Sequence, residues 1–270
     1  MSKKSNIITL RKSFKNFNFL NQKNQLFFFS FIFKRLVNRL FNLKGISVCD
    51  STFNFVNNQL FCFLVGYTRY TKIRFFKKKK LKRNFFSLNT NLQQLFSSSL
   101  KNLKISLVIF KFKNLNLFID RELLKYLYLK IKFVKRTLFA RRFFLFMDFL
   151  ALTSLFVQGL VKTPVFLQLL GDTFRLLPAR RHKFFLSFLK KLFQVLIDID
   201  FNHYLLKGTK IKGLKFILSG KIQGKLRGSK AIVQVGPVPI QSIEKNIEYS
   251  RIHVYTVFGS FGMKLWVFKN

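Results

Sequence analysis

The pattern of apolar and polar residues divides the first third of the chain into three kinds of segment. Residues 1–25 are polar, basic and rich in Asn, and they predict a tail. Residues 26–41 are apolar with three basic residues at helical spacing, which predicts a basic amphipathic helix. Two runs rich in Val, Phe and Tyr between residues 53 and 76 predict short strands. Residues 87–99 are polar and of low complexity, and we expect a linker there.

The middle of the chain has a helical period. Asp120–Leu138 predicts an amphipathic helix with its first residue as the N-cap. Residues 146–170 are largely apolar and predict one or two helices, broken near residues 163–164. Pro178 opens a basic helix that continues to residue 199. Four apolar residues are expected to line the buried face of that helix: Phe184, Phe188, Leu192 and Leu196.

After Gly208 the period changes to two, which predicts strands over residues 212–219, 231–235, 253–258 and 262–268. Glycines and prolines between these runs supply turns. The predicted fold class is α+β, with a helical middle and a mostly antiparallel C-terminal sheet. The predicted domains are a basic tail over 1–25, an N-terminal domain over 26–135, and a C-terminal domain over 136–270 with helices in 146–200 and a sheet in 210–270.

Charge narrows the classes of function. The 270 residues include 50 Lys+Arg and 9 Asp+Glu, for a formal charge of +41, yet 49% of the residues are hydrophobic and 39 are Phe. A disordered basic tail would contain few apolar residues. A free-standing soluble enzyme is disfavoured because such a single-sign charge repels itself. The chain therefore has material for a core and a surface that requires a polyanion, either nucleic acid or an anionic membrane.

The cations gather in three places: a run over residues 72–83, in which eight of twelve residues are basic, the helix after Pro178, and the first strands after Gly208. Such runs bind nucleic acid through its phosphates, because neutralised phosphates release counterions. The alternative for the run is a solvated linker. The RNA-binding residues predicted in these segments are Lys77, Lys78, Lys79, Lys80, Lys82, Arg83, Arg180, Arg181, Lys183, Lys190, Lys191, Lys212, Lys215, Lys221, Lys225 and Arg227.

No constellation of residues predicts catalysis, a metal or a cofactor. Cys49 and Cys62 lack the spacing of a zinc site, and the three histidines lie far from them, so we expect two idle or buried thiols. Phe143–Val161 is the best candidate for a membrane span, but it contains a charged residue, Asp148, and a buried helix is the preferred interpretation. A basic organellar membrane protein anchored there is the first alternative function.

Composition also suggests where the gene resides. Ala occurs only four times and Pro four times, whereas Phe, Leu, Lys, Asn and Ile, whose codons are rich in A and T, dominate. This bias is typical of an AT-rich organellar genome, and we expect a gene that resides in an organelle. The basic N-terminus also fits a mitochondrial presequence, which an organelle-made protein does not need.

Three C-terminal segments resemble motifs of a known family. They read KGLKFILSGKIQGK from Lys212, VGPVPIQSIEKNIEY from Val235 and GSFGMKLWVFKN from Gly259. All three are similar to motifs of the small-subunit ribosomal protein S-three family. The matched positions are Gly213, Lys215, Ser219, Gly220, Lys221, Gly236, Pro239, Ile247, Tyr249, Gly259, Gly262, Lys264, Trp266, Phe268 and Lys269.

Two further segments resemble the same family. The spacing of Lys4, Asn6, Ile8, Leu10 and Arg11 is similar to the family's opening, and Arg180-Arg181 through Phe184 to Lys190 resembles its basic helix. Lys4, Arg11 and Lys264 therefore join the predicted RNA-binding residues. The resemblance implies a non-enzymatic constituent of the small-subunit head that binds rRNA near the mRNA entry channel. It also implies contact with mRNA and with the head proteins S-ten and S-fourteen. Together with the organellar codon bias, it makes a mitochondrial version of this protein, on the ribosome at the matrix side, the leading hypothesis. A non-ribosomal RNA-binding factor is the second alternative.

The chain departs from the family in two places. The family's N-terminal domain is a KH domain with an IGxxG loop, but residues 1–170 contain only Gly45, Gly66 and Gly159, so that loop cannot be written. Either a KH-like fold persists without its clamp, or the region has been rebuilt. Phe185 and Leu186 stand where the family's basic helix has two arginines thought to contact mRNA, so mRNA unwinding is not carried over.

Overall fold

The computed structural model describes residues 46–56, 59–68, 107–137, 143–199, 210–225 and 227–269. These residues belong to two compact units, an N-terminal unit within residues 20–119 and a C-terminal unit that contains residues 120–270. Four predicted features lie outside the described residues: the tail over 1–25, the helix over 26–41, the basic run over 72–83 and the linker over 87–99.

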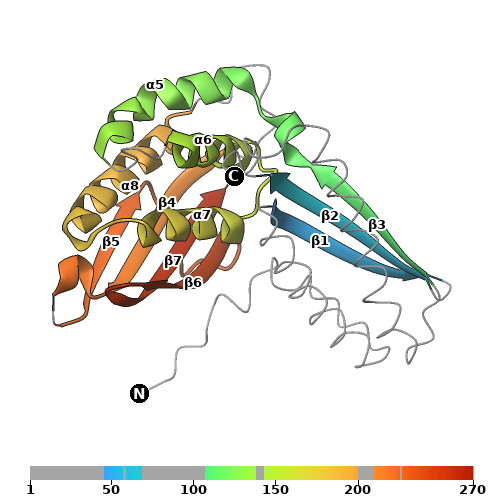
Figure 1. Ribbon diagram of the computed structural model, residues 1–270. Coiled ribbons are helices and arrows are strands. Elements are labelled where there is room, and N and C mark those ends of the chain that lie inside the picture. Colours follow the sequence, from blue (N-terminus) through green and yellow to red (C-terminus); the bar gives the residue numbers. More distant parts are fainter. Residues whose placement is uncertain are drawn as a thin grey trace. The chain divides into compact units, whose positions relative to one another are not determined.

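The N-terminal unit contains a three-stranded sheet, ordered β1-β2-β3 (Figure 1). Strands β1 (Ile46–Val56) and β2 (Gln59–Thr68) pair antiparallel, whereas β2 and β3 (Leu107–Asn114) pair parallel. A 3₁₀ turn, η3 (Leu115–Phe118), follows β3. The predicted strands between residues 53 and 76 are confirmed as parts of β1 and β2. A parallel pair requires a long connection, and 38 residues, 69–106, separate β2 from β3 in the sequence.

Cys49 is one of the two cysteines expected to be idle. Its side chain is buried, and its Sγ donates to the carbonyl oxygen of Ser47 at 3.7 Å. Burial, and then the neighbouring Asp50, raise the pKa of the Cys49 thiol to about 12. The thiol therefore stays protonated and unreactive, as predicted for this residue, while the side chain of Cys62 lies outside the described part of the chain.

Within the described residues, four helices precede the second sheet. They are α5 (Arg121–Thr137), α6 (Phe143–Val157), α7 (Thr163–Arg175) and α8 (His182–Ile197), with a 3₁₀ turn, η4 (Ala179–Arg181), before α8. The predicted N-cap is confirmed, because Asp120 Oδ1 accepts a hydrogen bond from the backbone N–H of Glu122 at 3.0 Å. The predicted break lies over residues 158–162, and Pro164 sits in the first turn of α7, where its missing N–H costs nothing.

Helix α6 is a core helix, apolar except for Asp148, Thr153 and Ser154, which are buried with the rest of it. It is 15 residues long, and Phe146, Phe149, Leu150 and Ala151 have no exposed surface. The preferred interpretation of this segment, a buried helix, is confirmed. Across the described residues, no helix combines the length and apolar character needed to cross a membrane.

The C-terminal sheet is antiparallel throughout, as the alternating pattern predicted. Its strands are β4 (Ile211–Gly220), β5 (Ser229–Val235), β6 (Ile247–Thr256) and β7 (Gly259–Lys269), in the order β5-β4-β7-β6. A short 3₁₀ turn, η5 (Ile222–Gly224), lies between β4 and β5. Strand β6 begins six residues before the predicted start at 253, and residues 257–258 form the turn into β7.

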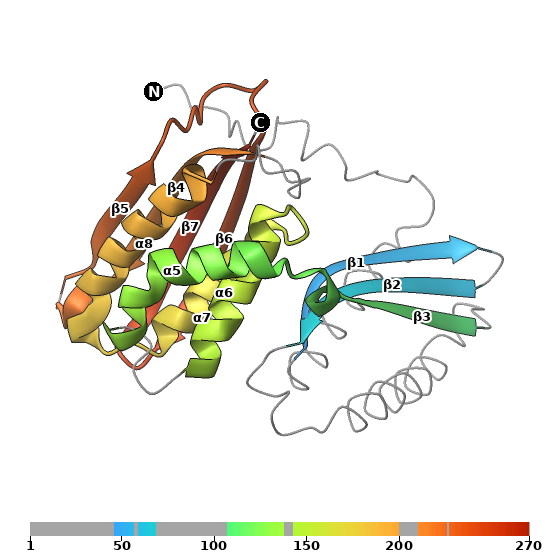
Figure 2. The ribbon, with the colours of Figure 1, turned by 90° about the horizontal axis from the view of Figure 1, so that it is seen from above.

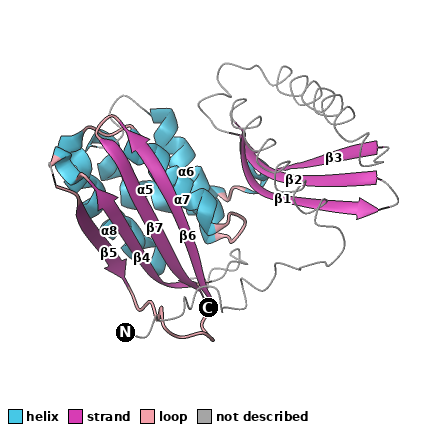
Figure 3. Cartoon of the chain, turned by 90° about the horizontal axis from the view of Figure 1, so that it is seen from below, coloured by secondary structure: helices cyan, strands magenta, loops and turns pink. Residues whose placement is uncertain are grey.

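The helices cover one face of this sheet (Figures 2 and 3). Helix α7 lies against β6 so closely that a Cβ on Gly171 would meet Ile252 Cδ1 at 2.7 Å. The buried face of α8 differs from the prediction at one position. Phe184 is 60% exposed and Phe185 is 1% exposed, so the expectation that Phe184 is buried was wrong. The reason is that His182, which is fully buried, sets the inner face, and Phe185 follows it one turn later.

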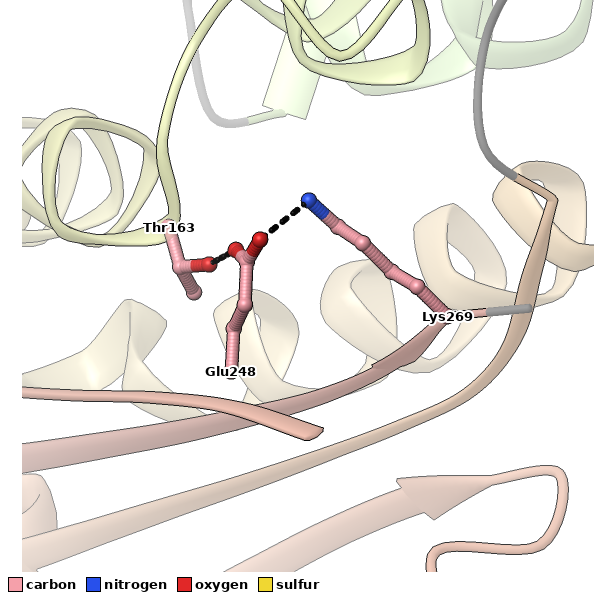
Figure 4. A network of polar contacts seen from close by, with 3 residues as sticks. All are labelled: Thr163, Glu248 and Lys269. Atoms are coloured by element: carbon pink, nitrogen blue, oxygen red, sulfur yellow. Dashed lines mark hydrogen bonds and ion pairs between the residues drawn. The ribbon is translucent and has the colours of Figure 1, made fainter. Parts of the chain in front are cut away.

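A polar contact joins three elements across the helix–sheet interface (Figure 4). Lys269 Nζ, at the end of β7, lies 2.8 Å from Glu248 Oε1 of β6, and its side chain is 8% exposed. Thr163, which opens α7, donates its hydroxyl to Glu248 Oε2. Lys269 Nζ also lies 5.6 Å from the centre of the Phe156 ring of α6. Glu248 thus points toward the helices, which explains why the start of β6 did not show the expected alternation.

We predict that Lys269→Met lowers the free energy of unfolding by about 1–3 kcal/mol, because it leaves the half-buried Glu248 carboxylate without its cation. Urea unfolding of the full chain, followed by circular dichroism, measures this. The double variant Glu248→Gln/Lys269→Met should recover part of the loss. Lys264→Met, on the opposite face of the same strand, is the control and should change stability by less than about 0.5 kcal/mol. Equal stability of Lys269→Met and the control would contradict this role for the ion pair.

Candidate nucleic-acid interface

The buried side chain of His182 joins the basic helix to the sheet. Its Nδ1 accepts a hydrogen bond from the backbone N–H of Gln223, in η5, at 3.1 Å. The ring packs against Phe174, with centroids 4.6 Å apart, and against Phe261, with centroids 5.5 Å apart. The backbone of Gln223 has a positive φ of 61°, which residues other than glycine rarely adopt. The hydrogen bond to His182 helps to stabilise this conformation.

This contact brings cations from two distant segments together. The turn η4 contacts η5, and a Cβ on Gly224 would lie 3.8 Å from the Cβ of Ala179. The two turns carry four exposed cations, which we call the η4–η5 cluster: Arg180, Arg181, Lys221 and Lys225. The sequence predicted each of these residues, but their proximity depends on the fold. The described acids Asp172 and Asp198 are on α7 and just after α8, outside the two turns.

The other predicted cations of this unit lie on separate surfaces. Lys183, Lys190 and Lys191 are exposed along α8, and Arg227 is exposed in the turn before β5. Lys212 Nζ lies 5.9 Å from the centre of the Phe268 ring. Lys215 and Lys264 lie on the face of the sheet that the helices leave uncovered. The predicted residues outside the described part are Lys4, Arg11, Lys77, Lys78, Lys79, Lys80, Lys82 and Arg83.

Sequence reasoning missed further polar residues on that uncovered face. Arg251 is paired with Lys264 in the register of β6 and β7, and His253 and Tyr255 follow it on the same face. Lys230 of β5, which the sequence already placed among the cations of the first strands after Gly208, is paired with Ser219 of β4. Arg251, His253 and Tyr255 alternate along β6, and this alternation could have placed them on one face. It was overlooked at Arg251 because the strand was predicted to begin only at His253.

The described residues offer little support for a catalytic or metal-binding site. Within those ranges, no group of three or more His, Cys, Asp and Glu side chains is placed to hold a metal ion. Burial lowers the pKa of His182 below its ordinary value of 6.5. A neutral His182 suits a hydrogen-bond acceptor that positions a turn. The arrangement offers cations on a rigid α+β frame, which is the chemistry of polyanion binding.

Comparison with known proteins finds no matching family model but several curated relatives. The small ribosomal subunit protein uS3c of Chlorella vulgaris is 39% identical over 60 residues, 22% of this chain and 26% of the relative. That of Angiopteris evecta is 36% identical over 66 residues, 24% of this chain and 30% of the relative. The uS3c protein of Oryza sativa is 34% identical over 64 residues, which is 24% of this chain and 27% of the relative.

The predicted resemblance to the S-three family is therefore confirmed, over about a quarter of the chain. The chain spans about a quarter to a third of the length of these curated relatives. The relatives are small-subunit ribosomal proteins of an organelle, named for the chloroplast. The mitochondrial part of the prediction therefore has no support from these names.

We predict that the stability of the protein falls as the pH drops below about 6.5, because the unfolded chain then protonates His182 while the folded chain keeps it neutral. The slope from this residue reaches at most about 1.4 kcal/mol per pH unit. His182→Gln keeps an acceptor for Gln223 and should flatten the curve in this range. Gln194→Ala, at an exposed position of the same helix, is the control and should keep the wild-type slope because it removes no titratable group. A His182→Gln curve that parallels wild type would contradict this assignment.

Proposed function

We propose that this chain is an organellar member of the ribosomal protein S-three family and a structural constituent of the small ribosomal subunit that binds rRNA. The observation that carries this proposal is the match to several uS3c proteins. The exposed η4–η5 cluster supports it, because rRNA supplies the counter-charge that a chain of formal charge +41 needs. The protein acts by contacts and shape, and it supports translation without chemistry of its own.

The mechanism is the neutralisation of phosphates by positioned cations. Each lysine or arginine that meets a phosphate releases condensed counterions, so affinity falls steeply with salt. Arg180 and Arg181 precede α8 and Lys221 and Lys225 flank η5, so the His182–Gln223 bond holds four cations as one group. A group held in place loses less conformational entropy on binding than four independent side chains would.

We further propose that the protein lies in the head of the small subunit near the mRNA entry channel, with S-ten and S-fourteen as neighbours. The family resemblance supports this placement. Contact with mRNA is assigned to Arg180 and Arg181, which are exposed. Unwinding of mRNA is not assigned, because Phe185, at a position where the family has arginine, is 1% exposed and packs beside Phe174 and Phe188.

The N-terminal unit is proposed to be a KH-like remnant. Its three-stranded sheet, with one antiparallel and one parallel pair, supports this proposal. In sequence, the connection between the parallel strands β2 and β3 contains no glycine, so a GxxG clamp cannot form there. The same connection contains the basic run over residues 72–83, and we assign phosphate contact to its lysines and arginines in place of the clamp.

The compartment is proposed to be the mitochondrion, on the ribosome at the matrix side. The support is the excess of residues with A/T-rich codons, since the matched relatives are chloroplast proteins. Both the codon bias and the names of the relatives support a ribosome inside an organelle.

We predict that the protein co-sediments with small ribosomal subunits from purified mitochondria and leaves them only in high salt, because phosphate contacts weaken with ionic strength. Sucrose-gradient fractions probed for this chain measure this. Recovery of this chain with small ribosomal subunits from plastids would overturn the proposed mitochondrial location but not the ribosomal role. Recovery in a ribosome-free membrane fraction that resists carbonate extraction would overturn the ribosomal role.

We predict that Lys221→Gln/Lys225→Gln weakens binding to the small-subunit rRNA uniformly across RNA sequences. Loss of two phosphate contacts should reduce the slope of log affinity against log salt by about 1.4–1.8. Salt titrations of RNA binding by the full chain measure this slope. Lys125→Gln/Lys132→Gln, two exposed lysines of α5, removes the same charge and is the control. Equal slopes for the two double variants would show that net charge, and not the η4–η5 cluster, determines affinity.

A further inference from the structure

We propose that the uncovered face of the C-terminal sheet is a second RNA-binding surface, distinct from the η4–η5 cluster, that holds a single strand of RNA. This inference rests on the proposed function and names a surface for it. We call this surface the open face. It is formed by six residues that point away from the helices: Lys230, Ile232, Arg251, His253, Tyr255 and Lys264.

The direction of these side chains follows from the packing of β6. A Cβ on Gly171 of α7 would meet the side chains of Ile252 and Val254 at 2.7 and 2.9 Å, so these two residues face the helices. Successive side chains of a strand point to opposite faces. Arg251, the residue before Ile252, therefore faces away, as do the alternate residues after it. Arg251, His253 and Tyr255 are all exposed.

The register of the strands places five of these residues in two rows across the sheet, and Tyr255 lies beyond the second row, opposite Ser260. Arg251 is opposite Lys264, which is opposite Ile217, which is opposite Ile232. The second row passes from His253 across Gly262 and Ser219 to Lys230. Neighbouring strands lie about 5 Å apart, so each row forms a short track of side chains across the four strands.

One end of this face is already closed by the chain itself. Val238 and Ile240 pack against Ile247, Trp266 and Phe268. The connection crosses β4 so closely that a Cβ on Gly213 would lie 2.1 Å from the carbonyl oxygen of Pro237. The large apolar residues at that end are thereby covered, and the two rows at the other end stay accessible.

The charges of the open face are unbalanced. Cations directly opposite each other on a sheet are destabilising, yet Arg251 faces Lys264. None of the positions on this face of the four described strands is Asp or Glu, and the strands' single acid, Glu248, lies on the covered face with Lys269. A polyanion that lies along the rows would neutralise this repulsion.

The remaining chemistry of the open face favours RNA over an acidic protein. Tyr255 lies on the same face two residues beyond His253 and is 72% exposed, and exposed aromatic rings stack on bases. Four-stranded sheets with aromatic residues on an open face bind single-stranded RNA in this way. Among its six residues, only Ile232 and Tyr255 are exposed large hydrophobic side chains, too few to anchor a protein partner through apolar contact.

The test separates charge from stacking in the full chain. Binding of poly(U) RNA is measured by fluorescence anisotropy over a series of salt concentrations. Arg251→Gln/Lys264→Gln should weaken binding and make the salt slope shallower by about 1.4, as expected for two contacts to a single strand. Tyr255→Ala should weaken binding about tenfold without changing the slope, because stacking releases no counterions. Lys125→Gln/Lys132→Gln on α5 is the charge-matched control, and circular dichroism checks that each variant folds.

The outcomes distinguish this inference from the proposed function. If the open-face variants bind poly(U) like the control while Lys221→Gln/Lys225→Gln loses rRNA affinity, the open face is not an RNA surface and the proposed function stands. If the open-face variants bind RNA normally but no longer join small subunits, the surface serves a protein partner and this inference is overturned. If the wild-type chain binds neither RNA, the proposed function itself fails.

Discussion

Electrostatic self-repulsion is the constraint under which the C-terminal unit folds. The whole chain has 9 acidic residues against 50 basic ones, so ion pairs within the protein can neutralise only a few cations. The fold uses its scarce carboxylates at structural joints. Asp120 caps α5, and Glu248 ties β6 to Thr163 of α7 and to Lys269 of β7. The cations with no such partner are placed on exposed positions, where solvent or an RNA phosphate can screen them.

The aromatic core supplies the stability that the charge removes. Phe174 of α7 contacts Phe185 of α8 and Phe261 of β7, with ring centroids 5.2 and 5.0 Å apart, and all three side chains are almost fully buried. Large aromatic residues bury more apolar surface for each position than aliphatic ones do. The Phe excess, which composition alone attributes to codon bias, therefore also has a physical use. His182 enters the same aromatic cluster, which is why its ring is neutral and available to accept from Gln223.

Periodicity predicted the elements of the C-terminal unit well, because each helix or strand buries one face or is wholly buried. It failed where a residue's direction is set by a distant partner. Phe184 fits a helical stripe as well as Phe185 does, and only the burial of His182 decides between them. The early part of β6 was missed because Glu248, a charged residue, points toward the helices. No local pattern could place η4 beside η5, since that contact joins segments about 40 residues apart through a side chain-to-backbone hydrogen bond.

Most residues that carry the family resemblance build the sheet, and only a few of them, such as Lys221 and Lys264, belong to its charged surfaces. Gly213 is needed because the carbonyl of Pro237 crosses it, and Gly236 adopts a φ of 72°, which favours glycine. Trp266 and Phe268 lie under the connection that closes one end of the sheet. A resemblance of this kind identifies a scaffold and gives little direct evidence about which cations touch RNA. The binding surface must therefore be argued from register and burial, and these place Arg251, which no motif contained, opposite Lys264, which a motif did contain.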